Sequence, residues 1–183
     1  MLYRTHIASS LALGTTVAVV SDYPYTVGFV AGVVLGSLLP DTDEPKSFIG
    51  QRTSGISKLV KMRFGHRGIT HSLLCWIGIS IICLFFPTPF TLGISLGYLF
   101  HLLGDLFSIS GIPLFAPFKK DKIKMFLRYK TGGLAEQVIF SVSILALLYI
   151  CTKEERLITN LGHSLGEIVT QFVTILKSVL SLM

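Results

Sequence analysis

The chain alternates long apolar runs with short polar and basic stretches, and this pattern predicts helices embedded in a membrane. Five runs are apolar and nearly free of charge, at 6–20, 25–39, 72–86, 90–107 and 134–151. Several fall short of the ~20 residues that a perpendicular span requires, so we expect the helices to extend into their polar ends or the bilayer to thin. The predicted fold class is all-α: a polytopic membrane helical bundle of about five transmembrane or membrane-embedded helices.

A sixth segment, 161–182, carries apolar residues at helical spacing that Glu167, Gln171 and Lys177 interrupt. This is the pattern of an amphipathic helix. Its apolar face could lie on the membrane, pack on the bundle or bind a second copy in a homo-oligomer. We therefore divide the chain into a membrane-embedded domain, 1–151, and a C-terminal amphipathic helix, 152–183.

Composition and charge support a membrane protein and give it an orientation. Hydrophobic residues make up 51% of the chain and charged residues 14%, against roughly 25% charged in a typical soluble domain. Of 16 Lys and Arg, six lie in 46–67 and six in 119–130. The positive-inside rule places both basic loops in the cytoplasm. The runs 72–86 and 90–107 then form one hairpin, and 6–20 and 25–39 form another.

In this topology the polar residues able to do chemistry gather at the cytoplasmic face. They are His6, Asp41, Asp43, His66, His71, His101, Asp105 and Glu136. His101 and Asp105 are four residues apart, so they share one helix face. Both lie within an apolar run, where ionisable groups indicate function because they are costly at membrane depth.

Mixed histidine and carboxylate ligands suit zinc, manganese or iron better than calcium or magnesium. Asp41 and Asp43 follow Pro40, and alternate carboxylates in a loop can both turn toward one cation. We expect Arg67 to bind a phosphate oxygen, and Asp43 or Glu136 to orient or deprotonate a water. Each residue alone also has a structural reading, such as Glu136 favouring a helix dipole.

Four motifs in order resemble the YdjM-like family, described as inner-membrane proteins predicted to be metal-dependent hydrolases. The motifs are Thr5-His6, Gly36-Ser37-Leu38-Leu39-Pro40-Asp41-x-Asp43, His66-Arg67-Gly68-x-Thr70-His71-Ser72 and Gly97-Tyr98-x-x-His101-x-x-x-Asp105. The resemblance covers roughly residues 1–150, and Glu136 also looks like a family acid.

That family is in turn distantly similar to zinc-dependent phospholipase C and the S1/P1 nucleases. The resemblance implies phosphoester substrates and the following metal ligands: His6, Asp41, His66 or His71, His101 and Asp105. Those soluble enzymes use their N-terminal residue as a ligand, whereas His6 stands behind Met1. We therefore expect two ions, zinc first and manganese or iron as alternatives.

The expected function is hydrolysis of a phosphoester in a phospholipid, lysophospholipid or other lipid phosphate, at the cytoplasmic face of a bacterial inner membrane. Two alternatives stay open: a metal-ion or proton transporter or binding protein, and a membrane-associated nuclease. Nucleic acid is the less favoured partner because the basic loops offer no clear platform for stacking bases. Their candidate exposed aromatic residues are Phe64, Phe118, Phe126 and Tyr129.

Overall fold

The fold is known from a computed structural model, which describes residues 1–44, 47–52, 62, 68–119 and 121–180. The α-helices are α1 (Tyr3–Val20), α2 (Val27–Gly36), α3 (Phe48–Arg52), α5 (Leu73–Phe85), α6 (Pro89–Leu106), α7 (Leu134–Lys153) and α8 (Glu155–Leu180). Two short 3-10 helices cover Leu39–Asp43 and Ile69–His71. The predicted all-α class is confirmed, since the described residues pair as β structure only at two isolated bridges.

Each of the six apolar segments forms a helix, and local chemistry sets where the helices begin and end. The second ends at Gly36 rather than near residue 39, because a separate 3-10 helix with Pro40 in its first turn starts at Leu39. The fourth starts at Pro89 behind a capping box, in which Thr88 and Thr91 each accept the other's backbone N–H. α8 begins at Glu155, six residues before the predicted segment.

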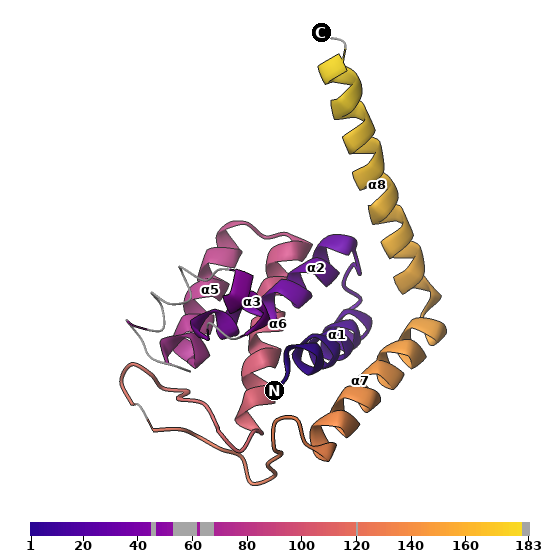
Figure 1. Ribbon diagram of the computed structural model, residues 1–183. Helices are drawn as coiled ribbons and strands as arrows, with labels where there is room; N and C mark the ends of the chain where they lie inside the picture. Colours follow the sequence, from indigo (N-terminus) through magenta and orange to yellow (C-terminus); the bar gives the residue numbers. More distant parts are fainter. Residues whose placement is uncertain (45–46, 53–61, 63–67, 120, 181–183) are drawn as a thin grey trace.

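Helices α2 and α6 pack side by side through glycines (Figure 1). Gly32 and Gly36 of α2 face Gly93 and Gly97 of α6. A Cβ on any of the four would come within 3.0 Å of backbone in the other helix, a distance that real Cβ atoms essentially never show. Small residues four apart allow this approach and are frequent between helices in membranes.

The burial pattern of α5 and α7 is the reverse of that in a water-soluble helix. None of the α5 side chains is buried. α7 buries only Glu136 and Ser143, and exposes apolar residues such as Val138 and Leu145. A surface helix in water normally turns its apolar face inward. This inversion is expected where lipid, rather than water, surrounds the helix.

Within the described ranges, one helix has both the length and the apolar character to cross a bilayer. This is α7, with 20 residues, whereas α5 is apolar but has 13. A 13-residue helix rises about 20 Å, less than the ~30 Å hydrocarbon core. Length and apolar character together therefore support one crossing, fewer than the about five that the hydrophobic pattern predicts.

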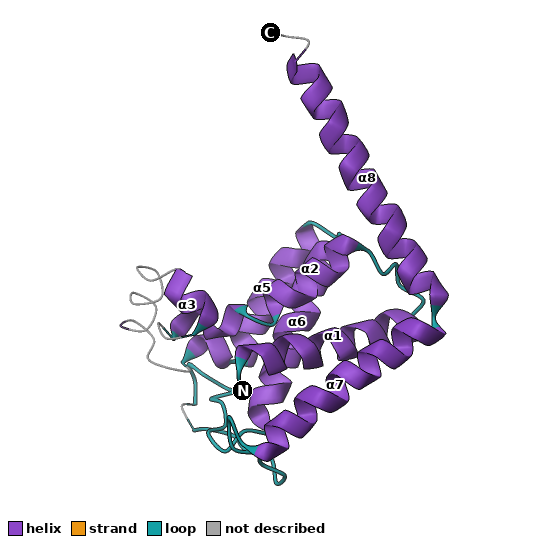
Figure 2. Cartoon of the chain, turned by 45° about the vertical axis from the view of Figure 1, so that its right-hand side comes forward, coloured by secondary structure: helices purple, strands orange, loops and turns teal. Residues whose placement is uncertain are grey.

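The last helix, α8, leaves the bundle and projects away from it (Figures 1 and 2). Its first turns are fixed: Leu157 is buried in a cluster with Phe29 and Val33, and Arg156 pairs with Asp22. Farther along, apolar side chains including Phe172 stay exposed. A homo-oligomer formed through this helix stays a prediction.

Candidate metal-binding site

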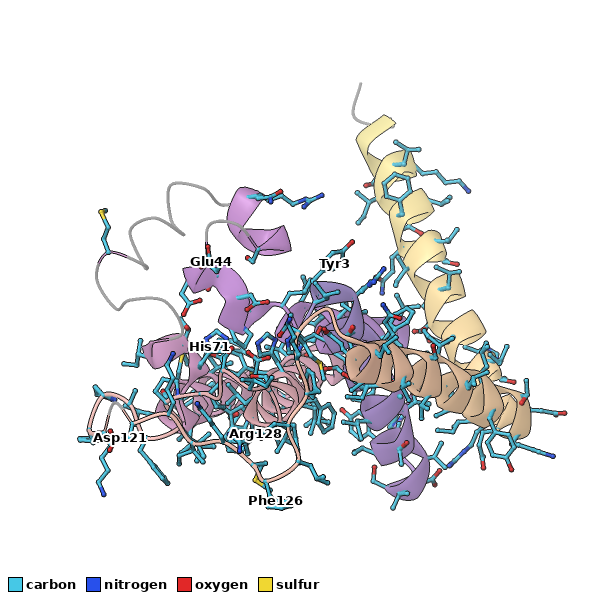
Figure 3. All side chains as sticks on the ribbon, turned by 60° about the horizontal axis from the view of Figure 1, so that its bottom comes forward. Tyr3, Glu44, His71, Asp121, Phe126 and Arg128 are labelled. Atoms are coloured by element: carbon cyan, nitrogen blue, oxygen red, sulfur yellow. The ribbon has the colours of Figure 1, made fainter. Side chains whose placement is uncertain are left out.

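Six of the candidate side chains come together at one end of the bundle, where the chain start lies beside the end of α6 (Figure 2). Four elements contribute them: α1, the two 3-10 helices and α6. The side chains are His6, Asp41, Asp43, His71, His101 and Asp105. All are buried except Asp41, whose side chain is 19% exposed. His71 is labelled in Figure 3, and its side chain is fully buried.

The first group that could hold a metal ion consists of His71, His101 and Asp105. Each offers one ligand atom, and these atoms all lie within 4.8 Å of one another. The Nε2 atoms of the two histidines are 3.4 Å apart, and His71 Nε2 lies 3.8 Å from Asp105 Oδ2. Two imidazoles and a carboxylate converging on one point form a typical ligand set for zinc.

The second group consists of His6, Asp41 and His101, again with ligand atoms within 4.8 Å of one another. The His6 and His101 rings stack, with centroids 3.7 Å apart and planes 7° from parallel. His6 Nε2 lies 3.4 Å from Asp105 Oδ1, yet neither ring nitrogen of this buried histidine makes a well-formed hydrogen bond to a described residue. Buried polar atoms are normally satisfied, so the unsatisfied Nε2 facing Asp105 fits a site made for a cation.

Asp105 links the two groups, because its two oxygens face different histidines. Oδ1 lies toward His6 and Oδ2 toward His71, at 3.4 and 3.8 Å from their Nε2 atoms. A carboxylate can give one oxygen to each of two neighbouring ions, whereas a single imidazole nitrogen binds only one. His101 is common to both groups but can serve only one ion through Nε2, whereas Asp105, with Oδ1 near His6 and Oδ2 near His71, could bridge two ions.

A backbone carbonyl fixes the orientation of the His101 ring. His101 Nδ1 lies 2.6 Å from the carbonyl oxygen of Ser37, so Nδ1–H donates and the lone pair of Nε2 points toward the other ligands. Metal-binding histidines usually have such a partner on their second nitrogen. Here the close packing of α2 on α6 supplies it, since Ser37 directly follows Gly36.

Asp41 and Asp43 approach opposite nitrogens of His71. Asp41 Oδ1 is 3.6 Å from Nε2, whereas Asp43 Oδ2 is 3.4 Å from Nδ1. A 3-10 helix has three residues per turn, so residues two apart point in different directions. Asp43 also accepts a hydrogen bond from Thr70 Oγ1, at 2.6 Å. This geometry favours Asp43 orienting His71, rather than both carboxylates facing one cation.

Electrostatics tie His71 to these carboxylates. Burial disfavours its charged form, but hydrogen bonding to Asp41 and Asp43 outweighs burial and raises the pKa of His71 to about 9. Burial likewise opposes ionisation of Asp41, but the neighbouring histidines hold the pKa of its carboxyl well below the usual range. The metal-free site therefore carries a proton on His71 at neutral pH, and a metal ion would displace it.

Glu136 has a different environment from the six clustered residues. Its carboxylate accepts backbone N–H groups from Leu2 and Gly132, each at 2.5 Å, and it belongs to neither ligand group. The preceding residue, Met1, places its amino group 2.7 Å from Asp105 Oδ1. Glu136 thus connects the start of α7 to Leu2, and the neighbouring Met1 contacts Asp105 of the cluster.

Replacing Glu136 by Gln separates an anchoring role from a catalytic one. The amide nitrogen of Gln would face an N–H group, so we expect the free energy of unfolding to fall by about 1–3 kcal/mol. Bound metal should remain, and the pH dependence of any activity should keep its shape. Thermal unfolding and metal content measure these two effects. Loss of metal at unchanged stability would contradict the anchoring role.

Two predicted residues, His66 and Arg67, lie outside the described residues. Three residues of the quoted motifs received no role in the sequence analysis but contribute to the site: Ser37 through its carbonyl, Thr70 and Tyr98. The Tyr98 hydroxyl donates to the Thr70 carbonyl, and the hydroxyl of Thr70 reaches Asp43. Thr70 adjoins His71, Tyr98 stands three residues before His101 and Ser37 four before Asp41, and this proximity in sequence was the available signal.

Fold and site together define an all-α protein with inverted burial and a buried group of histidines and carboxylates suited to a metal ion. The chain belongs to the YdjM inner membrane protein family, whose model matches residues 1–176. It is therefore a membrane protein, and the relatives' names indicate the bacterial inner membrane.

Among curated relatives, the inner membrane protein YdjM of Escherichia coli (strain K12) is 43% identical over 95 residues, which cover 48% of each chain. The match thus spans about half the length of that relative. The uncharacterized protein YvsG of Bacillus subtilis (strain 168) is 32% identical over 156 residues, covering 81% of this chain and 93% of its own. No solved structure matches, so the distant similarity to phospholipase C stays a prediction.

Proposed function

We propose that this protein is a membrane-bound, metal-dependent hydrolase of phosphoesters in lipid phosphates. The observation that carries the proposal is the pair of ligand groups that share His101, with Asp105 lying between His6 and His71, buried where the helices end. Buried imidazoles and carboxylates in such number are costly unless a cation satisfies them.

Two ions fit the arrangement better than one. His6 and Asp105 Oδ1 would belong to one ion, and His71 and Asp105 Oδ2 to the other. Asp41 and His101 would complete the two ligand sets. The Oδ1 atom of Asp41 lies 3.8 Å from the Nε2 atom of His101. Nitrogen with carboxylate oxygen favours zinc, with manganese or iron as alternatives.

Lipid phosphates suit a site at this position. The exposed apolar surfaces of α5 and α7 and the glycine contact of α2 with α6 support a bundle embedded in the bilayer at several helices. The positive-inside rule then puts the cluster at the cytoplasmic headgroup level. A lipid phosphate would meet it there by lateral diffusion.

A pair of bound metal ions would lower the pKa of a water and polarise the phosphate oxygens. The side chains of the protein would guide the substrate to the site, orient the attacking water and fix the protonation of the histidines. Because Asp41 is the exposed member of the cluster, the phosphate group would approach from its side, and its carboxylate would orient the attacking water. Asp43 keeps His71 in one tautomer through Nδ1. Phosphate binding by Arg67 stays a prediction.

Direct assay of the purified, detergent-solubilised protein tests this function. The protein is loaded with zinc or manganese and given phosphatidic acid, phosphatidylglycerol and a lysophospholipid, and released phosphate or phosphorylated headgroup is measured. We expect metal-dependent release that Asp41→Asn lowers by roughly 100-fold or more. Glu167→Gln, a change of an exposed acid on α8, is the control and should keep full activity.

Bound metal without hydrolysis of any of these lipids would overturn the proposal. Metal uptake by protein reconstituted in vesicles would then support the transporter alternative.

A further inference from the structure

In the segment that joins α6 to α7, the described residues 107–119 and 121–133 are held in a defined shape (Figure 1). Ile112 and Ile123 exchange backbone hydrogen bonds of 3.2 and 2.9 Å. The Tyr129 hydroxyl donates to the Gly104 carbonyl of α6 at 2.8 Å, next to the residue that links the metal-ligand groups. The outward face of this segment is therefore fixed relative to the site.

The apolar residues of the segment divide into two sets. Ile112, Ala116 and Tyr129 are buried against the bundle, which removes Tyr129 from the aromatic residues that the sequence suggested were exposed. Phe118, Phe126 and Leu127 point outward and are 84, 95 and 74% exposed. In Figure 3, Phe126 lies at the edge of the loop, away from the helices. Such aromatic exposure is rarely favourable in water.

Cationic side chains surround the exposed apolar ones. Every described basic residue of the loop is exposed and forms no ion pair within the described part of the chain: Lys119, Lys122, Lys124, Arg128 and Lys130. One acid, Asp121, accompanies them. Aromatic and aliphatic tips among Lys and Arg fit the boundary of an anionic bilayer, where apolar tips enter the acyl region and cations meet headgroups.

The position of the loop in the chain also supports contact between this surface and lipid. It ends directly before Leu134, the first residue of the helix that is long and apolar enough to cross a bilayer. Leu134 itself is exposed. A loop joined to the end of a membrane span lies at headgroup depth, so Phe126 is within reach of lipid.

We propose that the outward face of residues 115–119 and 121–130 is an anionic-lipid docking surface, with Phe118, Phe126 and Leu127 as its apolar anchors. The surface needs no metal and does not rest on the hydrolase proposal. Its fixed attachment to α6 would hold the buried cluster at headgroup level and gather anionic lipids beside it. Nucleic acid is the competing occupant for the same charges, but the burial of Tyr129 leaves fewer rings for bases.

Tryptophan quenching tests the proposal on the full chain. Phe126→Trp is introduced with Trp76→Phe, which removes the native tryptophan, and the protein is placed in nanodiscs carrying brominated acyl chains. We expect about twofold or more stronger quenching in phosphatidylglycerol than in phosphatidylcholine, reduced by high salt. Lys122→Trp on the same background is the matched control and should be quenched less, because its side chain stays in water.

Quenching that is absent, or equal in the two lipids, would overturn the proposal, as would a fluorescence response to single-stranded DNA in its place.

A second experiment uses the protein with its native Trp76. The combined change Phe118→Ser, Phe126→Ser and Leu127→Ser touches only exposed side chains, so folding should survive. It should lower the phosphatidylglycerol that co-purifies with the protein, measured by mass spectrometry, and an unchanged lipid ratio would count against the surface.

Discussion

Asp105→Asn should empty both proposed metal positions and abolish the proposed hydrolysis. The change keeps the volume of the side chain but removes the charge, and an amide nitrogen cannot bind a cation. Changing an outer partner of a metal site typically costs 10–100-fold in affinity, so losing the shared carboxylate should cost well over ~100-fold at each position. Metal content and phosphate release from a lipid phosphate measure the two losses.

The same exchange at Asp121 is the matched control for this result. Asp121 is exposed on the loop between α6 and α7, so Asp121→Asn should bind metal and unfold as the parent protein does. Full activity in Asp105→Asn, with the variant folded, would remove Asp105 from the site. Activity lost with both ions retained would show that the carboxylate acts on substrate instead of holding metal.

Gly97→Ala should weaken both the fold and the site. An alanine Cβ would collide with the Val33 carbonyl and press on the Ser37 backbone nitrogen, so α2 and α6 must separate. Overpacking of this kind costs about 1–3 kcal/mol. Separation also moves the Ser37 carbonyl away from His101 Nδ1, 2.6 Å in the parent protein. We expect a lower unfolding temperature and metal affinity reduced by roughly 10-fold or more.

Gly78→Ala is the control for the effect of replacing a helical glycine that has no close contact. Gly78 lies in α5, and an added Cβ there meets nothing within 4 Å. Alanine is the better helix former, so this variant should be unchanged or more stable by up to about 1 kcal/mol. Equal unfolding temperatures and metal affinities for Gly97→Ala and the parent would refute the tight α2–α6 contact.

Much of the fold follows from the chain itself, because apolar runs of this length have few alternatives to helix. The helices α1, α2, α5, α6 and α7 appear where the runs predict them. The gathering of six polar residues could also be foreseen, since the basic loops set the direction of each helix. The spacing of His101 and Asp105 was enough to put both on one face of α6.

The inner arrangement of the site needed the three-dimensional structure. Nothing in the spacing of Asp41 and Asp43 shows that a 3-10 turn sends them to opposite sides of His71. The contact of Glu136 with Leu2 joins residues far apart in sequence. The Gly-x-x-x-Gly spacings of α2 and α6 were visible in the sequence and predict close helix packing, but not which helices pair.

Metal stoichiometry tests the central claim most directly. The purified protein is stripped with a chelator, dialysed against zinc, and analysed for bound metal beside His6→Ala, His71→Ala and His163→Ala. We predict about two ions for the parent and for His163→Ala, whose residue is exposed on α8, and about one for each of the other two. No metal bound by the parent protein, after stripping and reloading with zinc, manganese and iron, would contradict the account.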